Sequence, residues 1–432
     1  MSIWQGVVAS AVSRWGDDPW ARGSWSLIGR GGTPRHRTDL GAPIGSRLRI
    51  AGEATHATRA AMTHGAYEEG VSAGAWAAEQ GHSRVAVIGA GIAGLAAART
   101  LTDRGVWTRV LEARDRVGGR TAPARVGGFG FDLGANWLQQ FHDNTLARLA
   151  ERLDLPMVPT DFTDPLVLGA PYTIPDGLED ELRARLAAAS EQAGIAEVLD
   201  GWLADPGRWT PDDIRRFVDA EIVMDSGAPL SWLSARHGFE PGVGEGDRWI
   251  VGGYRLLVDH LAENLDIRLN RPVHLVRTGP EGVTLDDDPR VDAVIVTAPV
   301  GVLAGGAITF DPPLPVTHRT ALERLGMGRV EKVILRCDRR FWPVRPAGYY
   351  RVHGPGENCV SEWLDATAAD GTPTLVGLFA GPWLDDLWAG PDDQVAARAA
   401  AVFAEAVHGF TTGDTGSARR GDPPDHQGGG HG

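Results

Sequence analysis

Lysine is nearly absent from this chain of 432 residues. Lys332 is the only lysine, and the other 41 basic side chains are arginine. Arginine does not lose its proton in proteins, whereas a lysine that is removed from water can do so. The single lysine is therefore a candidate reactive group, provided that the motifs around it independently place it at a reactive centre.

Cysteine and long apolar runs are equally scarce. The two cysteines, Cys337 and Cys359, are too few for a disulfide framework, and no residue pattern indicates a metal site. No stretch approaches the roughly 20 apolar residues that a membrane helix needs. The first 14 residues lack the basic leader and apolar core of a signal peptide. We therefore expect a cytoplasmic protein with no membrane partner.

Basic charge is also deficient. The chain carries a formal net charge of −14, which argues against nucleic acid as a partner because nucleic-acid-binding proteins need a basic surface. A negative charge is compatible with a cationic substrate, although acidic residues often serve only solubility. The length favours two domains. The sequence is silent on oligomeric state.

A glycine-rich turn between two short apolar runs gives the clearest local prediction. Residues 85–88 predict a buried parallel strand, Gly89-Ala90-Gly91-Ile92-Ala93-Gly94 a turn, residues 95–103 a helix and residues 110–112 a second strand. In such a unit the glycines let the backbone approach a pyrophosphate, which the positive end of the helix dipole attracts. Glu112 stands where an acidic side chain binds a ribose diol. We therefore predict a dinucleotide-binding site.

Another strand and helix precede this unit. Residues 47–50 predict a strand and residues 61–79 a helix, with Gly81 as its C-terminal cap. A helix that returns from the carboxyl end of one parallel strand arrives where a neighbouring strand begins, so the short connector at 80–83 is sufficient. Residues 47–88 are thus expected to form a strand–helix–strand unit.

The rest of the chain predicts a different architecture. Residues 179–201 and 211–225 indicate amphipathic helices with a turn at 205–207, and residues 392–407 indicate a further helix. From residue 411 onward the composition predicts a disordered tail. Short β-branched runs, with a hairpin turn at 279–282 and antiparallel pairing after residue 330, predict strands at 267–269, 273–276, 283–285, 291–296, 332–336, 349–352, 360–363 and 374–379.

Several short motifs follow the glycine turn in a fixed order. They are Arg114-Asp115-Arg116-Val117-Gly118-Gly119-Arg120, Asp132-Leu133-Gly134-Ala135-Asn136-Trp137, Trp249-Ile250-Val251-Gly252-Gly253-Tyr254, Thr297-Ala298-Pro299, the segment from Phe310 to Pro315, and Phe341-Trp342-Pro343. As an ordered set they resemble the flavin-containing amine oxidases, which include monoamine and polyamine oxidases and the lysine-specific histone demethylases. The resemblance covers most of residues 84–410.

The first 80 residues resemble the segment with which that family normally ends. The matching pieces are Trp15-Gly16-Asp17-Asp18-Pro19, Gly23-Ser24-Trp25-Ser26, Ala51-Gly52-Glu53-Ala54-Thr55 and His64-Gly65-Ala66. This order predicts a circularly permuted chain. A duplicated or fused fragment is the alternative, and the lack of a second copy after residue 410 counts against it. Permutation predicts that Gly409 lies close in space to residues 2–8.

The resemblance implies an α/β fold of two domains. One is an FAD-binding, Rossmann-like domain of the glutathione-reductase type, expected at 15–150 and 245–305, to which residues 15–80 contribute the relocated segment. The other is a mixed α+β substrate domain, expected at 1–14, 151–244 and 306–410. The tail at 411–432 follows it.

The cofactor-binding residues that the resemblance implies come from both parts of this order. Gly89, Gly91 and Gly94 would hold the FAD pyrophosphate, Glu112 the adenosine ribose and Val273 the adenine. The start of the helix near Thr63 would direct its positive end at the flavin N1/O2 edge. The full implied set is Gly52, Glu53, Thr63, Gly89, Gly91, Gly94, Glu112, Arg114, Gly118, Gly119, Arg120, Gly134, Ala135, Asn136, Trp137 and Val273.

Two side chains are implied at the reactive centre. Lys332 matches the family lysine that holds a water against flavin N5. Trp25 matches one wall of an aromatic cage that steers an amine and excludes water, whereas Met62 stands at the position of the other wall. Ser24 stands where some monoamine oxidases carry a cysteine bonded to the flavin, which favours noncovalent FAD.

The implied reaction is oxidation of an amine C–N bond. Hydride passes to flavin N5, the imine hydrolyses, and O2 reoxidises the flavin and yields H2O2. The substrate nitrogen must be neutral, so the rate is expected to rise with pH through an amine pKa. The segment Gly134-Ala135-Asn136-Trp137 lacks the Met-Arg pair of many L-amino-acid oxidases, which favours an amine. An L-amino-acid oxidase, a flavin desaturase and a non-catalytic FAD-binding scaffold stay open, and the sequence does not name the amine.

Overall fold

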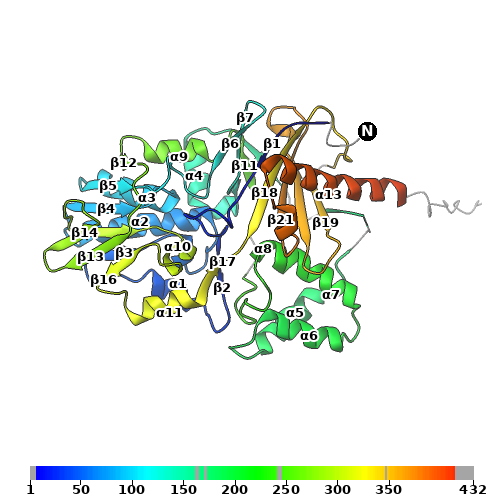
Figure 1. Ribbon diagram of the computed structural model, residues 1–432, viewed down its shortest axis with the longest axis horizontal. Helices are drawn as coiled ribbons and strands as arrows, with labels where there is room; N and C mark the ends of the chain where they lie inside the picture. Colours follow the sequence, from blue (N-terminus) through cyan, green and yellow to red (C-terminus); the bar gives the residue numbers. More distant parts are fainter. Residues whose placement is uncertain (1–5, 161–164, 170–172, 241–245, 346–347, 414–432) are drawn as a thin grey trace, which may run out of the picture.

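The computed structural model describes residues 6–160, 165–169, 173–240, 246–345 and 348–413. Its elements form two main groups that stand side by side, one around a parallel sheet and the other around a largely antiparallel sheet (Figure 1). A third group, of helices alone, lies below the second sheet in this view. Among the described residues, no helix has both the length and the hydropathy needed to cross a bilayer.

The parallel sheet has five strands in the order β12-β5-β4-β15-β3. All four residues of β15 are buried, as expected for a strand covered on both faces. The strands predicted near residues 47–50, 85–88 and 291–296 are confirmed, so the first 50 residues supply one edge of the sheet. The strands are β12 (Asp266–Arg268), β5 (Trp107–Leu111), β4 (Arg84–Ile88), β15 (Ala293–Val296) and β3 (Leu48–Ile50).

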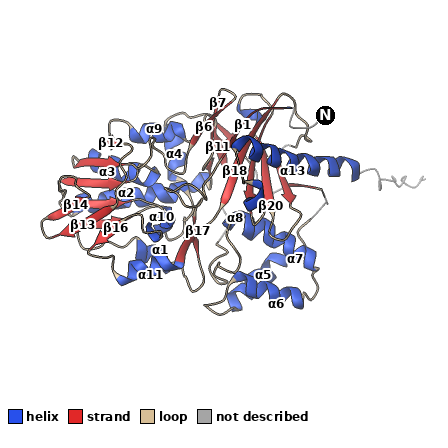
Figure 2. Ribbon diagram, in the orientation of Figure 1, coloured by secondary structure: helices blue, strands red, loops and turns tan. Residues whose placement is uncertain are grey.

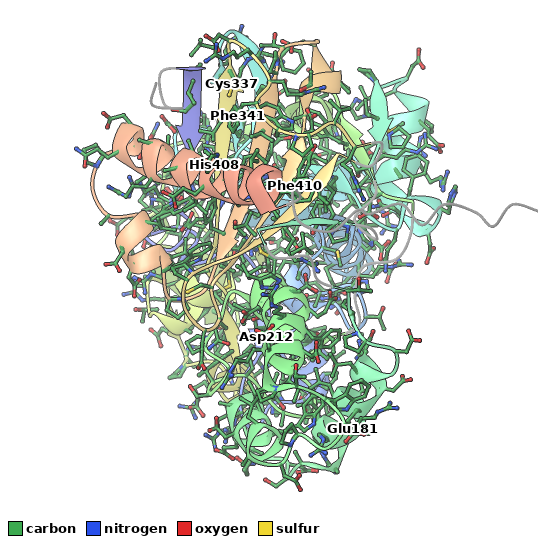
Figure 3. All side chains as sticks on the ribbon, turned by 90° about the vertical axis from the view of Figure 1, so that its right-hand side faces the viewer. Glu181, Asp212, Cys337, Phe341, His408 and Phe410 are labelled. Carbon is green, nitrogen blue, oxygen red and sulfur yellow. The ribbon has the colours of Figure 1, made fainter. Side chains whose placement is uncertain are left out.

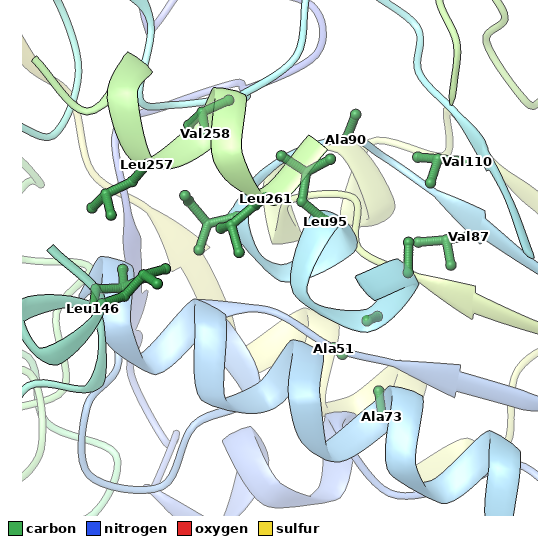
Figure 4. Close-up of a cluster of buried hydrophobic side chains, with 14 of the residues drawn as sticks. Ala51, Ala73, Val87, Ala90, Leu95, Val110, Leu146, Leu257, Val258 and Leu261 are labelled. Atoms are coloured by element: carbon green, nitrogen blue, oxygen red, sulfur yellow. The ribbon is translucent and has the colours of Figure 1, made fainter. Parts of the chain in front are cut away.

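Alternate residues of β4 face two different hydrophobic clusters. Val85 and Val87 face the cluster that contains the paired helices α2 (Thr63–Glu79) and α3 (Ile92–Asp103). A Cβ on Gly70 of α2 would lie 2.1 Å from the carbonyl oxygen of Ala93, so glycine is what allows the two helices to approach so closely. The same cluster includes two further helices, α4 (Thr145–Arg152) and α9 (Arg255–Ala262) (Figure 4).

The other face of the parallel sheet, to which Ala86 and Ile88 of β4 contribute, packs on short elements from distant parts of the chain. The predicted hairpin turn at 279–282 is confirmed, because Gly279 pairs with Gly282. The elements on this side are β13 (Leu275–Gly279), β14 (Gly282–Leu285), β16 (Thr309–Asp311), α1 (Arg35–Leu40), α10 (Val300–Ala304), α11 (Val316–Arg324) and the pair β2 (Ser26–Ile28) and β17 (Leu325–Met327).

The second sheet has six strands in the order β1-β18-β21-β20-β19-β10. Its pairs are antiparallel, as predicted, except for the parallel edge pair of β19 and β10. One face packs on α13 (Asp392–Gly413), where the rings of Trp363 and Phe403 lie 4.7 Å apart. The strands are β1 (Val7–Val12), β18 (Val330–Cys337), β21 (Thr374–Ala380), β20 (Val360–Asp365), β19 (Tyr349–His353) and β10 (Leu166–Leu168).

The helices of the third group differ from the prediction in one respect (Figure 2). The single helix expected at 179–201 is wrong, because the chain breaks between α5 (Leu178–Ala188) and α6 (Ile195–Ala204). At the break, a Cβ on Gly194 would lie 2.7 Å from the carbonyl oxygen of Ser231. The backbone at Gly194 therefore packs against the loop that contains Ser231 and does not continue as a helix. The helix expected at 211–225 is confirmed as α7 (Pro211–Val218), a π-helical turn (Asp219–Val223) and α8 (Met224–Ser226).

Several short elements carry too weak a pattern for prediction. They are β6 (Pro123–Val126), β7 (Phe129–Asp132), β8 (Trp137–Leu138), β9 (Met157–Pro159), β11 (Arg248–Ile250) and α12 (Leu384–Leu387). The predicted start of the tail at residue 411 is too early, because α13 continues to Gly413. The remainder of that tail, 414–432, falls outside the described residues.

The two ends of the described chain lie on one hydrophobic cluster. Val7 of β1 and Phe410 of α13 both pack against the cluster between α13 and the six-stranded sheet. Figure 3 shows α13, with His408 and Phe410 labelled, crossing the sheet face near Cys337. Gly409 nevertheless lies beside Gly169, which follows the edge strand β10, whereas Gly6 lies beside Asp338 at the opposite, β1 edge of the sheet. The proximity expected between Gly409 and residues 6–8 is therefore wrong, and residues 2–5 lie outside the described part.

Candidate active site

A cavity of about 1650 Å³ opens between the two sheets. Its walls come from the carboxyl ends of β4 and β5, from the first 66 residues and from the six-stranded sheet. Every residue that the sequence assigned to the site lines this cavity, with the exception of Gly94. Motifs from distant parts of the chain thus converge on one place in the fold.

The glycine turn joins β4 to α3 at the edge of the parallel sheet. Gly89 has a φ of +101°, which favours glycine. Gly91 is the N-cap of α3, no side chain caps this helix, and a Cβ on Gly91 would meet no protein atom within 4 Å. The first N–H groups of α3 therefore lack side-chain partners beside open space, as a phosphate-binding turn requires.

Gly94 differs from Gly89 and Gly91 in its surroundings. A Cβ there would lie 1.8 Å from the carbonyl oxygen of Gly89 and 2.9 Å from Oγ1 of Thr297. The residue is buried and does not line the cavity. Gly94 thus permits close packing of α3 on the sheet, and its contact with a pyrophosphate stays a prediction.

Glu112 is held just beyond β5 by two backbone amides. The N–H of Ala90 donates to Oε2 over 2.7 Å, and the N–H of Arg114 donates to Oε1 over 2.9 Å. The carboxylate is buried and lines the cavity. Because each carboxylate oxygen can accept more than one hydrogen bond, Glu112 can fix the glycine turn and still bind hydroxyl groups of a ligand.

Arg114 and Arg120 tie the N-terminal segment to the motif that they flank. Arg114 pairs with Asp18 over 2.7 Å, and Nη1 of Arg120 donates to Oε1 of Glu53 over 2.8 Å. Burial opposes ionisation of Glu53, but the Arg120 guanidinium and the Ser26 hydroxyl outweigh it and hold the pKa of this carboxyl below its ordinary value. Two ion pairs therefore fix the N-terminal segment in the cavity wall.

Helix α2 begins at the cavity. Its N-cap Met62 and its first residue Thr63 line the cavity, and no side chain caps the helix. Oγ1 of Thr63 lies 2.7 Å from the hydroxyl of Tyr254, which donates to the carbonyl of Trp137 over 2.8 Å. The positive end of the dipole of this long helix is thus available to an electron-rich ligand.

Lys332 lies on β18, whose eight residues are all buried. Its Nζ donates to the carbonyl oxygen of Asp132 over 3.2 Å, to the carbonyl oxygen of Gly134 and to Oδ1 of Asn136. Burial lowers the pKa of the Lys332 ammonium, and the Asp132 carboxyl offsets only part of this shift. The one lysine of the chain is therefore buried at the cavity wall, in an environment that favours its neutral form.

Asp132 belongs to a motif of the sequence but received no role there. Its Oδ2 accepts a hydrogen bond from the N–H of Tyr254 over 2.9 Å. Its Oδ1 is buried and has no hydrogen-bond partner in the described structure. Burial raises the pKa of this carboxyl, and the Tyr254 amide and Lys332 lower it only in part. Asp132 and Lys332 thus form a buried acid–base pair beneath the cavity.

A row of side chains crosses the six-stranded sheet beneath the cavity. Lys332 pairs with Leu378, Leu378 with Glu362, and Glu362 with Arg351, each in directly opposed register. Directly opposed residues point to the same face of a sheet, and all four line the cavity. Because neighbouring strands lie about 4.7–4.9 Å apart, the backbone of Arg351 stands roughly 14 Å from that of Lys332.

Three carboxylates, which we call the acidic group, surround the far end of this row. They are Glu221 of the π-helical turn, Asp225 of α8 and Glu362 of β20. Nη2 of Arg351 lies 2.8 Å from Oε1 of Glu362 and 3.6 Å from Oε1 of Glu221. Asp225 has no ion-pair partner in the described part of the chain. No motif of the sequence indicates this group, although strand alternation places Glu362 on the same face of the sheet as Leu378 and Arg351.

Asp225 is surrounded by protein but its side chain is exposed to the cavity. Burial, together with the nearby carboxyls of Glu362 and Glu221, raises its pKa to about 8. Trp25 lines the cavity beside it, and its Nε1 donates to the backbone carbonyl of Asp225 over 2.8 Å. The predicted aromatic wall thus also helps to position the acidic group.

The residues present fit a flavin dinucleotide. The uncapped starts of α2 and α3 suit a flavin edge and a pyrophosphate, and the available carboxylate of Glu112 suits a ribose. Gly91 and Gly52 have no side chain, and the space that a Cβ would occupy at each of them is open in the cavity wall. Within the described ranges, no group of three His, Cys, Asp or Glu side chains could hold a metal ion.

Comparison with known proteins agrees with this geometry. The family described as flavin containing amine oxidoreductase matches residues 4–75, 92–176 and 236–420. Probable polyamine oxidase 4 of Arabidopsis thaliana is 32% identical over 70% of this chain and 67% of its own length, and polyamine oxidase 2 of the same plant is 30% identical over 74% and 70%.

A solved structure supports the same fold. Cyclohexylamine oxidase from Brevibacterium oxydans superimposes with a TM-score of 0.58 at 23% identity, covering 76% of this chain and 81% of its own. The sequence match extends over most of the chain, and the glycine turn, the carboxylate of Glu112 and the buried lysine meet in one cavity. The protein belongs to the flavin-containing amine oxidoreductase family.

Proposed function

We propose that this protein oxidises an amine that carries a further positive charge, of the diamine or polyamine class. The acidic group carries this proposal, because its three carboxyl groups outnumber Arg351, the arginine that pairs with them, and surround the far end of the row that starts at Lys332. An excess of negative charge in a cavity favours a cationic ligand. Relatives named polyamine oxidase, at 30–32% identity, support the same class.

We propose that FAD binds noncovalently. The Ser24 hydroxyl is engaged by the carbonyl of Gly328 over 3.0 Å and the N–H of Val330 over 3.0 Å, and it offers no thiol for a bond to the flavin. Gly89, Gly91, Gly118 and Gly119 would leave room for the pyrophosphate. The other implied residues, apart from Gly94, keep the roles that the family resemblance gives them.

Lys332 and Trp25 act at the reacting end in this proposal. When bound, FAD accepts a hydride from the carbon next to the amine nitrogen and passes the electrons to oxygen. A neutral Lys332 has two N–H donors, which serve two of its three carbonyl acceptors at a time, and a lone pair with which to accept a hydrogen bond from a water. Trp25 would exclude bulk water from one side of the substrate and hold it by contact with its ring.

The acidic group would orient the substrate by its distant nitrogen. An ammonium placed near Asp225 and Glu221 keeps its proton, because nearby carboxylates favour the charged form. The reacting nitrogen lies away from them and must be neutral to react. The observed rate should therefore rise with pH through the pKa of the reacting amine.

An L-amino-acid oxidase is the main alternative that this geometry disfavours. Binding an α-carboxylate calls for an arginine that is free to form a bidentate pair. Arg351 directs both Nε and Nη2 at Oε1 of Glu362, over 3.0 and 2.8 Å. Arg183, also at the cavity, is bonded to Glu179 over 2.7 Å.

A peroxide assay of the yellow protein tests the proposal. The panel is n-butylamine, putrescine, spermidine and L-leucine, with flavin bleaching under anaerobic conditions as a second readout. We expect turnover of at least one amine with two or more nitrogens and none of L-leucine. Activity on L-leucine alone, or bound flavin that no amine reduces, would overturn the proposal.

We further propose that the chain is circularly permuted and divided into two domains. In support, β3 and α2 from the first 80 residues complete the parallel sheet and its helix layer. The FAD-binding domain would comprise 15–150 and 245–305 and the substrate domain 1–14, 151–244 and 306–410. Because β16 pairs with β13, we place residues 306–327 with the FAD-binding domain instead.

A further inference from the structure

Arg351 is the arginine that pairs with the acidic group, and its position is fixed from several sides. It lies opposite Glu362 on the neighbouring strand, and both guanidinium bonds to Glu362 end on Oε1. Its side chain is only 9% exposed and that of Glu362 12%. Nη2 also lies 3.6 Å from Glu221, which reaches in from the helical side of the cavity. The guanidinium therefore bridges the sheet and the π-helical turn.

The location of Arg351 is where the far end of a long cationic substrate would lie. The row runs from Lys332 at the reacting end through Leu378 and Glu362 to Arg351, and all four residues line the cavity. A guanidinium and a substrate ammonium present similar donors to a carboxylate. Arg351 thus satisfies Glu362, and in part Glu221, as a bound cation would, and leaves Asp225 without an ion-pair partner in the described residues.

We propose that Arg351 determines substrate length: its guanidinium occupies Glu362 in place of a substrate nitrogen, so the cavity accepts one charged nitrogen beyond the reacting one. The preferred substrate class is then a diamine. A triamine could bind only by displacing the guanidinium or leaving its last ammonium unpaired. This inference rests on the proposed function, because it assumes that the substrate is a cationic amine lying along the row.

The test removes the guanidinium and measures for which amines binding and turnover improve. Arg351→Met keeps the length of the side chain without its charge, and Arg351→Lys keeps the charge without the planar fork. The probes are n-butylamine, putrescine and spermidine, with KM and kcat from peroxide release and Kd from calorimetry. For Arg351→Met we expect KM and Kd for spermidine to fall at least about tenfold, the scale of one charge-assisted hydrogen bond. The values for n-butylamine should stay within about twofold.

Two further variants separate this role from simple support of the fold. Arg351→Met combined with Glu362→Gln should lose the gain for spermidine, because no carboxylate is then released. Arg351→Lys should retain the wild-type preference. Arg336→Met is the matched control: Arg336 is a buried arginine on β18 that pairs with Asp370 and lies outside the cavity lining. It should lower Tm without changing the ratio of the three amines.

The outcomes are distinguishable. A gain confined to spermidine in Arg351→Met, and lost with Glu362→Gln, supports the inference. Equal changes for all three amines, or an unchanged ratio, overturn it and leave Arg351 a structural residue. If the wild type oxidises no amine, the proposed function fails, while the calorimetric preference for spermidine over putrescine still decides whether Arg351 limits the length of bound cations.

Discussion

Nζ of Lys332 donates a hydrogen bond to Oδ1 of Asn136, which joins the six-stranded sheet to the loop after β7. Two carbonyl oxygens of the same loop, from Asp132 and Gly134, accept from the same nitrogen. The lysine is therefore held in one place by a segment that also lines the cofactor cavity. This arrangement favours a role in chemistry over a role in solubility.

Replacing Lys332 by Met should slow both reduction of the flavin by amine and its reoxidation by oxygen. We expect a loss on the order of 100-fold in at least one step, the lower end of what a positioned proton-transfer group contributes. Stopped-flow absorbance of the flavin measures both rates. Lys332→Arg, which cannot become neutral, should be similarly slow, and wild-type rates in either variant would contradict the assignment.

Two glycines of the same turn should respond differently to alanine. In Gly91→Ala the new methyl group meets no protein atom and projects into the cavity, so FAD affinity should fall about tenfold or more while the cofactor-free protein keeps its Tm. In Gly94→Ala the methyl group collides with backbone, so the cofactor-free protein should lose about 1–3 kcal/mol of stability. Flavin-fluorescence titration and thermal unfolding separate the two effects, and identical behaviour would contradict the assigned roles.

Asp225 should make the unliganded protein less stable as pH rises. Its pKa is about 8 in the folded protein and about 3.9 when unfolded. Between these values the folded state binds more protons than the unfolded state, so the free energy of unfolding decreases with increasing pH. The Tm of Asp225→Asn should therefore fall less than that of the wild type as the pH is raised from 5 to 8. An equal loss in both proteins would show that the carboxyl ionises freely in the cavity.

The proposed permutation predicts that moving the first segment to the end of the chain gives a functional protein. The variant begins at His82, runs to Gly413 and continues through a Gly/Ser linker of about 25 residues, with a root-mean-square reach of roughly 27 Å, into Gly6 to Gly81. The exposed connector at 80–83 is opened in the process. We expect a yellow protein that binds FAD within about threefold of the original, since permutation at surface loops is usually tolerated. A colourless or insoluble product would count against the permutation.

The parts of the fold that were predictable are those specified by local pattern. The run 85–88, the glycine turn and Glu112 lie within one short segment, so their spacing alone identifies the unit. Lys332 stood out because it is unique in the chain. In contrast, the contact of Gly94 with the carbonyl of Gly89 is a matter of packing, and the same glycine pattern would be expected for direct contact with a phosphate.

The acidic group could not be predicted because its members meet only through tertiary structure. Glu221 and Asp225 lie in a predicted helix, and Arg351 and Glu362 in two predicted strands. The register between β19 and β20, and the packing of the π-helical turn against them, bring these four residues together. The break at 189–194 was missed for the same reason, since a distant loop provides the backbone contact at Gly194.

The row from Lys332 to Arg351 fixes how far each of its side chains stands from the reacting end, because each residue belongs to a different strand. Hydrogen bonds between strands set each interval at about 4.7–4.9 Å, and no side-chain substitution can stretch it. A carboxylate on the sheet can therefore stand only at whole multiples of the strand spacing from the reacting end. Finer adjustment comes from rotamers and from groups above the sheet, such as Asp225. Enzymes that share this sheet should therefore prefer substrates whose lengths differ by discrete steps, according to which strand carries the carboxylate that binds the substrate.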